Sequence, residues 1–372
     1  MPSRVRFLIN PFLILTMNKA RYTNKIPEDR GEVIKVIEEV KKPVKVMILG
    51  GVDSGKTTLA VFLTNELLKN GFKVGVIDSD VGQKGILPPG LISLGFPEKV
   101  FNSLEEIKAE KHYFVGTITP NQFFGEMITG VKLLVNEALD TADVLIIDTT
   151  GLIHGPGVEL KRMKIEVIQP EIIIALQKKD ELENIIRPFE KKAKVFRLKI
   201  SENAKLHTRE ERRRIRREKW RKYFEQAQEY TISLQNMMIS GTWIFQGEEV
   251  TKKEKEMLEN LFKWIIFHGR KVSNKYFVVK ADIGNFPRNF NKNTLLTCDF
   301  ENLSNLIVGF IDKEGFCLGL GILKFINFRE FTAQIITPLK KEDLENVVEL
   351  RFGRIRVRED GEELGLLSRE AL

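Results

Sequence analysis

The chain has 372 residues, of which 42% are hydrophobic and 30% charged, a balance that describes a soluble globular protein with room for two domains. Its formal net charge of +8 and its pI near 9.2 favour a polyanionic partner such as a nucleic acid over a membrane. The two cysteines, Cys298 and Cys317, have no metal-binding spacing and offer no disulfide framework, which excludes a disulfide-stapled secreted scaffold and predicts a reducing, cytoplasmic location.

The first 17 residues look only superficially like a signal peptide. Two arginines precede an apolar stretch, but Pro11 interrupts it and no small-residue cleavage site follows. The stretch is also too short to span a bilayer. We therefore expect residues 1–17 to be disordered or to lie upstream of a true start at Met17. The predicted N-terminal extension, residues 1–42, also includes a short helix over 28–40.

The stretch 44–71 contains the phosphate-binding pattern G-x-x-x-x-G-K-[ST] at Gly50, Gly55, Lys56 and Thr57. An apolar run with strand-like period-2 spacing precedes it, and apolar residues at helical spacing follow it. Glycines let backbone N–H groups point at phosphate oxygens, and the helix N-terminus adds partial positive charge. Lys56 is expected to reach the β- and γ-phosphates, and the Thr57 hydroxyl to ligate Mg²⁺. The predicted nucleotide-binding residues are Gly50, Gly51, Val52, Asp53, Ser54, Gly55, Lys56, Thr57 and Thr58.

The second predicted strand, 73–78, and a later one, 144–148, each end in a carboxylate at the sheet edge where ligands bind in open α/β folds. Asp78 and Asp80 lie two apart in extended chain, so their side chains face the same way. One can organise Mg²⁺ while the other accepts a proton from an attacking hydroxyl; alternatively, Asp78 only hydrogen-bonds the loop backbone. Asp148 fits the acidic residue that holds Mg²⁺ through water.

Further polar positions follow the same strands. Gln83, at the start of a Gly- and Pro-rich surface loop predicted over 82–95, is placed to hold an acceptor. Gly151 lets the backbone approach the γ-phosphate, while Thr150 is either a ligand or a turn former at the strand end.

Strands are also predicted at 113–117, 172–176 and 195–200, with helical segments at 127–139 and 181–186. Because the strands are almost continuously apolar and alternate with helices, we predict an α/β fold: a P-loop NTPase parallel sheet with helices on both faces.

The segment 208–224, TREERRRIRREKWRKYF, carries the densest charge in the chain. Like charges at i,i+4 destabilise a helix, so an anion is expected in the working state, either the transferring phosphoryl group or a nucleic-acid backbone. Arginine favours bidentate phosphate contact. We predict a lid over the nucleotide at 205–224; the alternative is a solvated charged face.

After residue 235 the pattern changes to short strands, at 306–310, 317–325, 331–337 and 354–357, after a helical entry around 254–268. The predicted organisation is therefore an N-terminal extension (1–42), a P-loop domain with its lid (43–235), and a smaller, mainly β C-terminal domain (236–372).

At this point the motifs GGVDSGKTTL, IDSDVGQ, TITP and IDTTGLI, with the Arg-rich stretch ending in YF, resemble those of the polynucleotide 5′-hydroxyl kinases in sequence and order. This family includes the kinase subunit of the pre-mRNA cleavage complex and nucleolar kinases of ribosomal-RNA processing. The resemblance covers about 42–224, and it extends to the β-rich tail through GLGILKFIN, IITPL and GRIRV.

The resemblance implies transfer of the γ-phosphoryl group of ATP, or another NTP, to the 5′-hydroxyl of RNA or DNA. It assigns Lys56 and Thr57 to phosphate and Mg²⁺, Asp80 as the base, and Gln83 and Thr119 to the polynucleotide end. From their own positions at the strand ends, we add Asp78 and Asp148 as candidate metal ligands and Thr150 and Gly151 as candidate substrate-binding residues. Arg216 and Arg221 would be the lid residues that stabilise the transition state, although the run offers several registers.

Two departures from the family pattern matter. Larger members carry an N-terminal β domain that helps to hold the nucleobase, whereas only about forty residues precede the sheet here. Those members often have a bulky aromatic residue after T-x-G, where this chain has Leu152. Two other functions fit the same motifs: a non-catalytic, ATP-bound scaffold of RNA processing, and a GTPase or ATPase stimulated by a protein partner.

Overall fold

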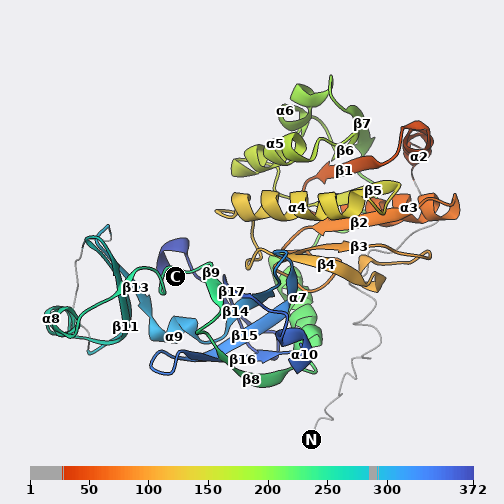
Figure 1. The fold of residues 1–372 in the computed structure, drawn as a ribbon. Coiled ribbons are helices and arrows are strands. Elements are labelled where there is room, and N and C mark those ends of the chain that lie inside the picture. Colours follow the sequence, from red (N-terminus) through yellow and green to blue (C-terminus); the bar gives the residue numbers. More distant parts are fainter. Residues whose placement is uncertain (1–26, 28, 285–290, 292) are drawn as a thin grey trace, which may run out of the picture.

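The computed structural model describes residues 27, 29–284, 291 and 293–372 (Figure 1). The expectations for residues 1–17 therefore lie outside the described residues. The helix predicted over 28–40 is present as α2 (Arg30–Glu39).

Within the described residues, the first sheet has seven strands in the order β4-β3-β2-β5-β1-β6-β7. Their bounds are β1 (Val44–Gly50), β2 (Val74–Ser79), β3 (Leu91–Gly95), β4 (Ala109–Phe114), β5 (Val144–Thr149), β6 (Ile172–Gln177) and β7 (Lys194–Lys199). The five strands from β2 to β7 in that order are parallel, as predicted.

The other two strands correct the sequence prediction. β3 pairs antiparallel with β2, and β4 antiparallel with β3, so the sheet is mixed at this edge. β3 lies within 82–95, the stretch predicted as a loop because of its Gly and Pro content. The chain turns at Gly90, where φ is +81°, and only the five residues of β3 then extend.

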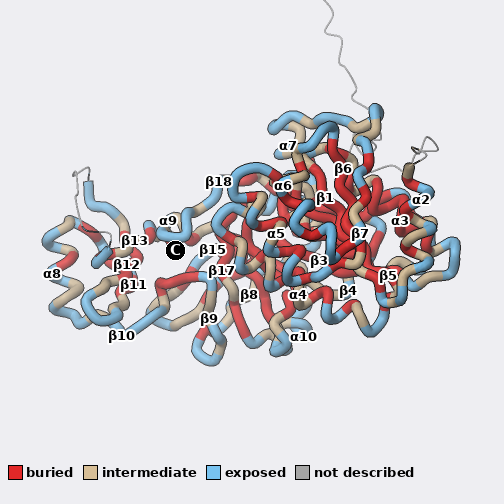
Figure 2. The backbone as a smooth tube through the Cα atoms, turned by 90° about the horizontal axis from the view of Figure 1, so that it is seen from above, coloured by how far each residue is buried: buried red, intermediate tan, exposed pale blue. Residues whose placement is uncertain are grey.

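Helices cover both faces of this sheet, as predicted (Figure 1). On β1, Val46 and Ile48 pack with α2 and α3 (Lys56–Lys69), whereas Met47 and Leu49 pack with α4 (Phe124–Leu139) and α5 (Pro156–Ile168). Figure 2 shows the strands of this sheet as the most continuously buried part of the chain. Shorter helical segments are η1 (Leu104–Glu106), α6 (Glu183–Ile186) and η2 (Arg187–Phe189).

The arginine-rich segment forms one helix, α7 (Arg209–Phe224), whose N-terminus is a capping box in which Thr208 and Glu211 bond each other's backbone. Its apolar residues do not face solvent. Trp220 is fully buried, and with Phe224 it joins Leu91 and Phe114 of the first sheet to apolar residues of the C-terminal strands. α7 is therefore packed between the two parts of the molecule.

The C-terminal part is mainly β, as predicted, but it begins earlier and contains two sheets. β8 (Gln228–Ser233), which the predicted boundary at 235 left in the first domain, pairs with β16 of the larger sheet. That sheet has the order β18-β17-β14-β15-β16-β8, with β9 beside β17, and a separate sheet has the order β10-β11-β12-β13. None of the helices in the described part of the chain is long and apolar enough to cross a membrane.

The bounds of the C-terminal elements are β9 (Met238–Ser240), β10 (Glu248–Glu249), α8 (Lys252–Phe262), β11 (Trp264–Val272), β12 (Lys275–Asp282), β13 (Leu295–Asp299), α9 (Phe300–Leu303), β14 (Leu306–Ile311), β15 (Cys317–Asn327), β16 (Thr332–Thr337), α10 (Lys341–Leu344), β17 (Glu349–Val357), β18 (Glu363–Leu366) and η3 (Arg369–Ala371). The helix expected over 254–268 thus ends at Phe262. From Trp264 to His268 buried and exposed residues alternate, as they do in a strand with one buried face.

Two glycines allow the two parts to touch through their backbones. Gly116 follows β4 with φ +72°, and its carbonyl accepts a hydrogen bond from the backbone N–H of Arg354 at 2.7 Å. A Cβ atom at Gly353 would lie 2.7 Å from that same carbonyl oxygen and 2.8 Å from Ile307 O. Only glycine at position 353 permits this approach.

We expect Gly353→Ala to destabilise the protein by about 1–3 kcal/mol, because the added methyl group meets backbone atoms that cannot move aside. Thermal unfolding measures the change. Gly31→Ala is the control, since its Cβ in α2 would meet nothing within 4 Å. A Gly353→Ala variant as stable as the Gly31→Ala variant would contradict the proposed close packing.

Candidate active site

The phosphate loop connects β1 to α3 and leaves donors without protein partners. Gly55 takes φ +86° at the N-cap of α3 and supplies no side-chain cap, so the first-turn N–H groups remain available. Lys56 donates its ammonium to Gly51 O at 2.7 Å. The Ser54 hydroxyl is buried and has no hydrogen-bond partner among the described residues. An orphaned hydroxyl, an uncapped helix and a lysine on one loop fit the phosphates of a nucleotide.

A hydroxyl and a carboxylate meet beside this loop. The Thr57 hydroxyl donates to Asp148 Oδ2 at 2.7 Å, and the backbone N–H of Thr149 donates to Asp148 Oδ1 at 2.9 Å. Burial and the nearby Asp78 carboxylate raise the pKa of Asp148 to about 6. A bound cation would offset that cost. Oxygen donors of this kind fit Mg²⁺, which typically binds one or two carboxylates together with substrate phosphates.

Asp78 is fully buried and already engaged by its own loop. Its Oδ2 accepts the backbone N–H groups of Gly85 and Ile86 at 2.6 and 2.8 Å and lies 3.2 Å from the Lys84 ammonium. Its Oδ1 accepts the N–H of Asp80 at 3.1 Å. Of the two alternatives for Asp78, this geometry favours the one in which it holds the loop backbone.

Asp80 is placed differently from Asp78. Its Oδ1 accepts the N–H groups of Gly82 and Gln83 at 3.0 and 2.9 Å, which fixes the turn, while its Oδ2 has no hydrogen-bond partner in the described structure. A Cβ at Gly82 would lie 2.7 Å from Ile118 O, so this turn touches the segment that carries Thr119. The turn that carries Asp80 and Gln83 therefore lies against the segment that carries Thr119.

The Thr149-Thr150-Gly151 turn packs directly on the phosphate loop. A Cβ at Gly151 would lie 2.7 Å from Val52, so the close approach requires glycine. Thr150 is buried, and both its carbonyl and its hydroxyl oxygen accept from Lys161, at 2.6 and 3.1 Å. Thr150 and Gly151 thus lie at the nucleotide side of the site.

Three fully buried lysines surround these carboxylates, and the sequence analysis missed all three. Lys84 pairs with Asp78, whereas Lys161 and Lys164 project from α5. Lys164 donates to the Ser79 hydroxyl at 3.1 Å, and Asp80 is the carboxylate whose charge acts on it most strongly. The signal was their spacing: Lys161 and Lys164 share the face of α5 that buries Ile165 and Ile168.

Burial governs the ionisation of these lysines. It lowers the pKa of Lys164 to about 7, although Asp80 partly opposes the shift. Burial, reinforced by the neighbouring Lys164 charge, lowers the pKa of Lys161 well below its ordinary value. Burial also lowers the pKa of Lys84, which Asp78 counteracts.

The arginines of α7 have different partners in the structure. Arg212 reaches the phosphate loop, with Nη1 at 3.1 Å from Asp53 Oδ2. Arg216 instead makes a two-bond ion pair with Glu363 of β18, at 2.7 and 2.8 Å. Arg221 pairs with Glu218 on the surface of α7 at 2.8 Å. The structure thus brings Arg212 to the phosphate loop and leaves Arg216 and Arg221 at the C-terminal side.

The expectation that this helix needs an external anion is not supported by these contacts. Carboxylates offset much of the repulsion along α7, four of them from other parts of the chain and one from α7 itself. The pairs are Arg212 with Asp53, Arg216 with Glu363, Arg217 with Asp360, Lys219 with Glu105, and Arg221 with Glu218.

Comparisons with known proteins agree with this geometry. Residues 50–226 match the family described as mRNA cleavage and polyadenylation factor CLP1 P-loop. The polyribonucleotide 5′-hydroxyl-kinase of Methanocaldococcus jannaschii is 57% identical over 356 residues, which cover 96% of this chain and 99% of the relative. That of Pyrococcus abyssi is 56% identical over 358 residues, covering 96% of this chain and 100% of the relative. A chain of the wild-type Clp1p–Pcf11p complex shares the fold, with a TM-score of 0.57 at 15% identity over 88% of this chain and 77% of that one.

We expect Lys164→Met to flatten the dependence of unfolding free energy on pH between 7 and 10. The pKa of Lys164 is about 7 in the folded chain and near 10.5 when unfolded, so the unfolded chain binds more protons in this window. Stability from this group therefore rises with pH, by up to about 1.4 kcal/mol per unit, and is constant below pH 7. Replacement by methionine removes that slope.

Chemical unfolding at pH 7, 8, 9 and 10 measures the effect. Lys192→Met, at an exposed position before β7, should keep the slope of the unmodified protein. Equal slopes in Lys164→Met and the unmodified protein would show that Lys164 is not held in the low-pKa state.

Proposed function

Because this chain belongs to the polyribonucleotide 5′-hydroxyl kinase family, we propose how its own residues carry out that family's reaction. The chain is a P-loop kinase for the 5′-hydroxyl end of a polynucleotide, and it binds a nucleotide with a divalent cation. We assign ATP as the phosphoryl donor and Mg²⁺ as the cation. The observation that carries the residue assignment is the free Oδ2 of Asp80. This residue directly follows β2, the strand that pairs with the Asp148-bearing strand β5.

The donor side is built from residues 50–58. In this proposal the backbone N–H groups and the Ser54 hydroxyl bind the phosphates, and Lys56 exchanges its bond to Gly51 O for phosphate oxygens. Thr57 and Asp148 would hold the cation, which when bound neutralises charge on the β- and γ-phosphates. Asp78 contributes indirectly, by fixing the loop that carries Asp80.

On the acceptor side, Asp80 takes the proton of the attacking 5′-hydroxyl through its free Oδ2. Gln83 and Thr119 hold the polynucleotide end, since their segments touch at Gly82 and Ile118. Thr150 and Gly151 hold the other side of the transferring group against the phosphate loop. The new 5′-phosphate is thus formed between the turn that carries Asp80 and the phosphate loop.

We propose that Arg212 is the lid arginine that acts on the transferring phosphoryl group, because it already contacts the phosphate loop through Asp53. An arginine at this place stabilises the negative charge that spreads over the equatorial oxygens in the transition state. Arg216 supports the lid from behind, through its buried pair with Glu363, and Arg221 is the most remote of the three.

The purified protein, with labelled ATP, Mg²⁺ and a 5′-hydroxyl RNA oligonucleotide, should transfer label to the 5′ end. We expect Asp80→Asn to lower kcat by at least about 100-fold, the usual scale of general-base catalysis, while the affinity for ATP stays within about threefold. Lys56→Ala should weaken both. Label transfer by Asp80→Asn at the unmodified rate would remove Asp80 from the role of base, and no transfer by the unmodified protein would overturn the function.

Among single alanine variants of the lid, Arg212→Ala should have the largest effect on kcat, about 1,000-fold, as for other arginines that act on a transferring phosphoryl group. Arg216→Ala should mainly lower thermal stability, because it leaves Glu363 buried without its partner. Arg221→Ala should change kcat less than about threefold, as its surface pair contributes little. A larger loss of kcat in Arg221→Ala than in Arg212→Ala would restore the register predicted from the sequence.

A further inference from the structure

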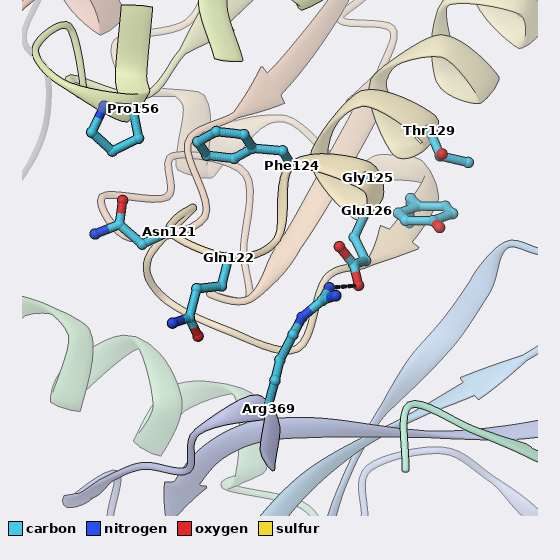
Figure 3. A pocket seen from close by; sticks show the side chains of 9 residues that line it. Asn121, Gln122, Phe124, Gly125, Glu126, Thr129, Pro156 and Arg369 are labelled. Carbon is cyan, nitrogen blue, oxygen red and sulfur yellow. Dashed lines mark hydrogen bonds and ion pairs between the residues drawn. The ribbon is translucent and has the colours of Figure 1, made fainter. Parts of the chain in front are cut away.

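A pocket of about 680 Å³ lies beside the acceptor side of the site and has no role in the reaction described above (Figure 3). It is enclosed by the segment Asn121–Gln122, the first turn of α4, the start of α5 at Pro156, and Arg369 from the C-terminal end. Asn121 is two residues from Thr119, and Pro156 follows the Thr150-Gly151 turn. A chain whose 5′ end is held by Thr119 therefore has this pocket within reach of its next nucleotides.

One wall of the pocket is suited to a planar base. Phe124 and Tyr113 both line it, and Figure 3 shows the Phe124 ring lying across the pocket between Pro156 and Glu126. Aromatic rings bind single-stranded nucleic acid by stacking on the bases, which is tolerant of sequence. The amide side chains of Asn121 and Gln122 add hydrogen-bonding groups on the same side.

Another wall is suited to a phosphate. α4 has 16 residues and begins at Phe124 without a side-chain cap, because Phe123 occupies the N-cap position. A Cβ at Gly125 would meet nothing within 4 Å, so the first-turn backbone is open toward the pocket. The Arg369 guanidinium lies over the Phe123 ring at 4.8 Å and remains about half exposed. An open helix N-terminus next to an arginine attracts a phosphate group.

The acidic residue of the pocket distinguishes between ligands. Glu126 forms an ion pair with Arg369, and its Oε2 is buried without a hydrogen-bond partner in the described structure. An ionised carboxylate accepts up to about four hydrogen bonds, so Glu126 retains acceptor capacity. Phosphates and DNA sugars within a strand offer it no hydroxyl donor. A ribose 2′-hydroxyl supplies the donor that it lacks.

We propose that this pocket binds a ribonucleotide just downstream of the 5′-terminal one, and that the Glu126 carboxylate accepts a hydrogen bond from its 2′-hydroxyl. The base stacks on Phe124, and the adjoining phosphate lies between the start of α4 and Arg369. The pocket is thus the element that favours RNA over DNA. This inference rests on the proposed function, because it concerns the acceptor strand of the same reaction.

The test is a scan of 5′-hydroxyl RNA oligonucleotides that carry one 2′-deoxy sugar at each of the first five positions in turn. In the unmodified protein, a 2′-deoxy sugar at one particular position after the first should raise the KM for the oligonucleotide by roughly tenfold. This is the effect expected from the loss of a hydrogen bond to a charged group. Glu126→Met, which removes the acceptor, should show the higher KM with every oligonucleotide and no dependence on that position. Glu126→Gln, which keeps an acceptor oxygen, should retain the dependence.

Glu137→Met is the matched control, since Glu137 lies on α4 but pairs with Lys111 away from the pocket. The KM for ATP should be unchanged in all variants, which separates the pocket from the donor side and from misfolding. Phe124→Leu should raise KM for RNA and DNA alike, because stacking does not read the sugar. Two results would overturn the proposal. One is a rise in KM that is equal for a deoxy sugar at every position, and the other is a Glu126→Met variant that distinguishes the deoxy positions as the unmodified protein does.

These outcomes are distinct from a failure of the kinase function itself. If the unmodified protein transfers label to RNA but no deoxy position matters, only the pocket assignment fails. If it transfers label to no 5′-hydroxyl end, the function fails as well.

Discussion

The site depends on charges buried together at one edge of the first sheet. Asp78 and Asp148 lie opposite each other on β2 and β5, and both are almost fully buried. An isolated ion in such a place costs several kcal/mol, so its neighbours must compensate. Lys84 does so for Asp78 at 3.2 Å, and Lys164 does so at longer range for Asp80. Removing one of these charges would leave its partners buried without compensation. The carboxylates and lysines at this edge of the sheet therefore depend on one another and act as one unit.

That unit holds Asp78 and the proposed base, Asp80, in place before any substrate binds. Both carboxylate oxygens of Asp78 bond its own loop, whereas Asp80 uses one carboxylate oxygen on its turn and keeps the other free. The orientation of the free oxygen is thereby fixed by backbone N–H groups rather than by solvent. Preorganisation of this kind lowers the barrier to reaction, because little reorganisation remains for the transition state.

The sequence was sufficient for the parts of the protein whose chemistry is local. The phosphate loop, its strand and its helix follow from residues 44–71, since glycine positions and apolar spacing are dictated by nearest neighbours in the chain. The identities of Asp80 and Asp148 followed from their places at strand ends. Properties set by distant residues could not be found in this way. Lys161 resembles any helical lysine until β2, β5 and the phosphate loop surround it.

The same limit explains why the sequence could not reveal the partner of Arg216 or the strand β3. The position of Arg216 is decided by Glu363, 147 residues later, and no local pattern connects the two. β3 is a five-residue strand after a Pro- and Gly-rich turn, and its partner strands are supplied by the rest of the sheet. Propensity favours a loop there, and tertiary pairing overrides it.

The packing of α7 limits how its arginines can move during a reaction. Trp220 and Phe224 are buried among residues of both domains, so rotating the whole helix would expose a large apolar cluster. The segment before the helix is held less firmly. Leu206 is 79% exposed, and His207 bonds to Asp53 of the phosphate loop and, through its carbonyl oxygen, to Arg212. A change at the phosphate loop therefore reaches Arg212 through Asp53 and the start of α7, while the C-terminal half of the helix stays fixed on the β domain. In the proposed mechanism, the C-terminal domain would thus serve the reaction by anchoring α7, while the phosphate loop belongs to the first domain.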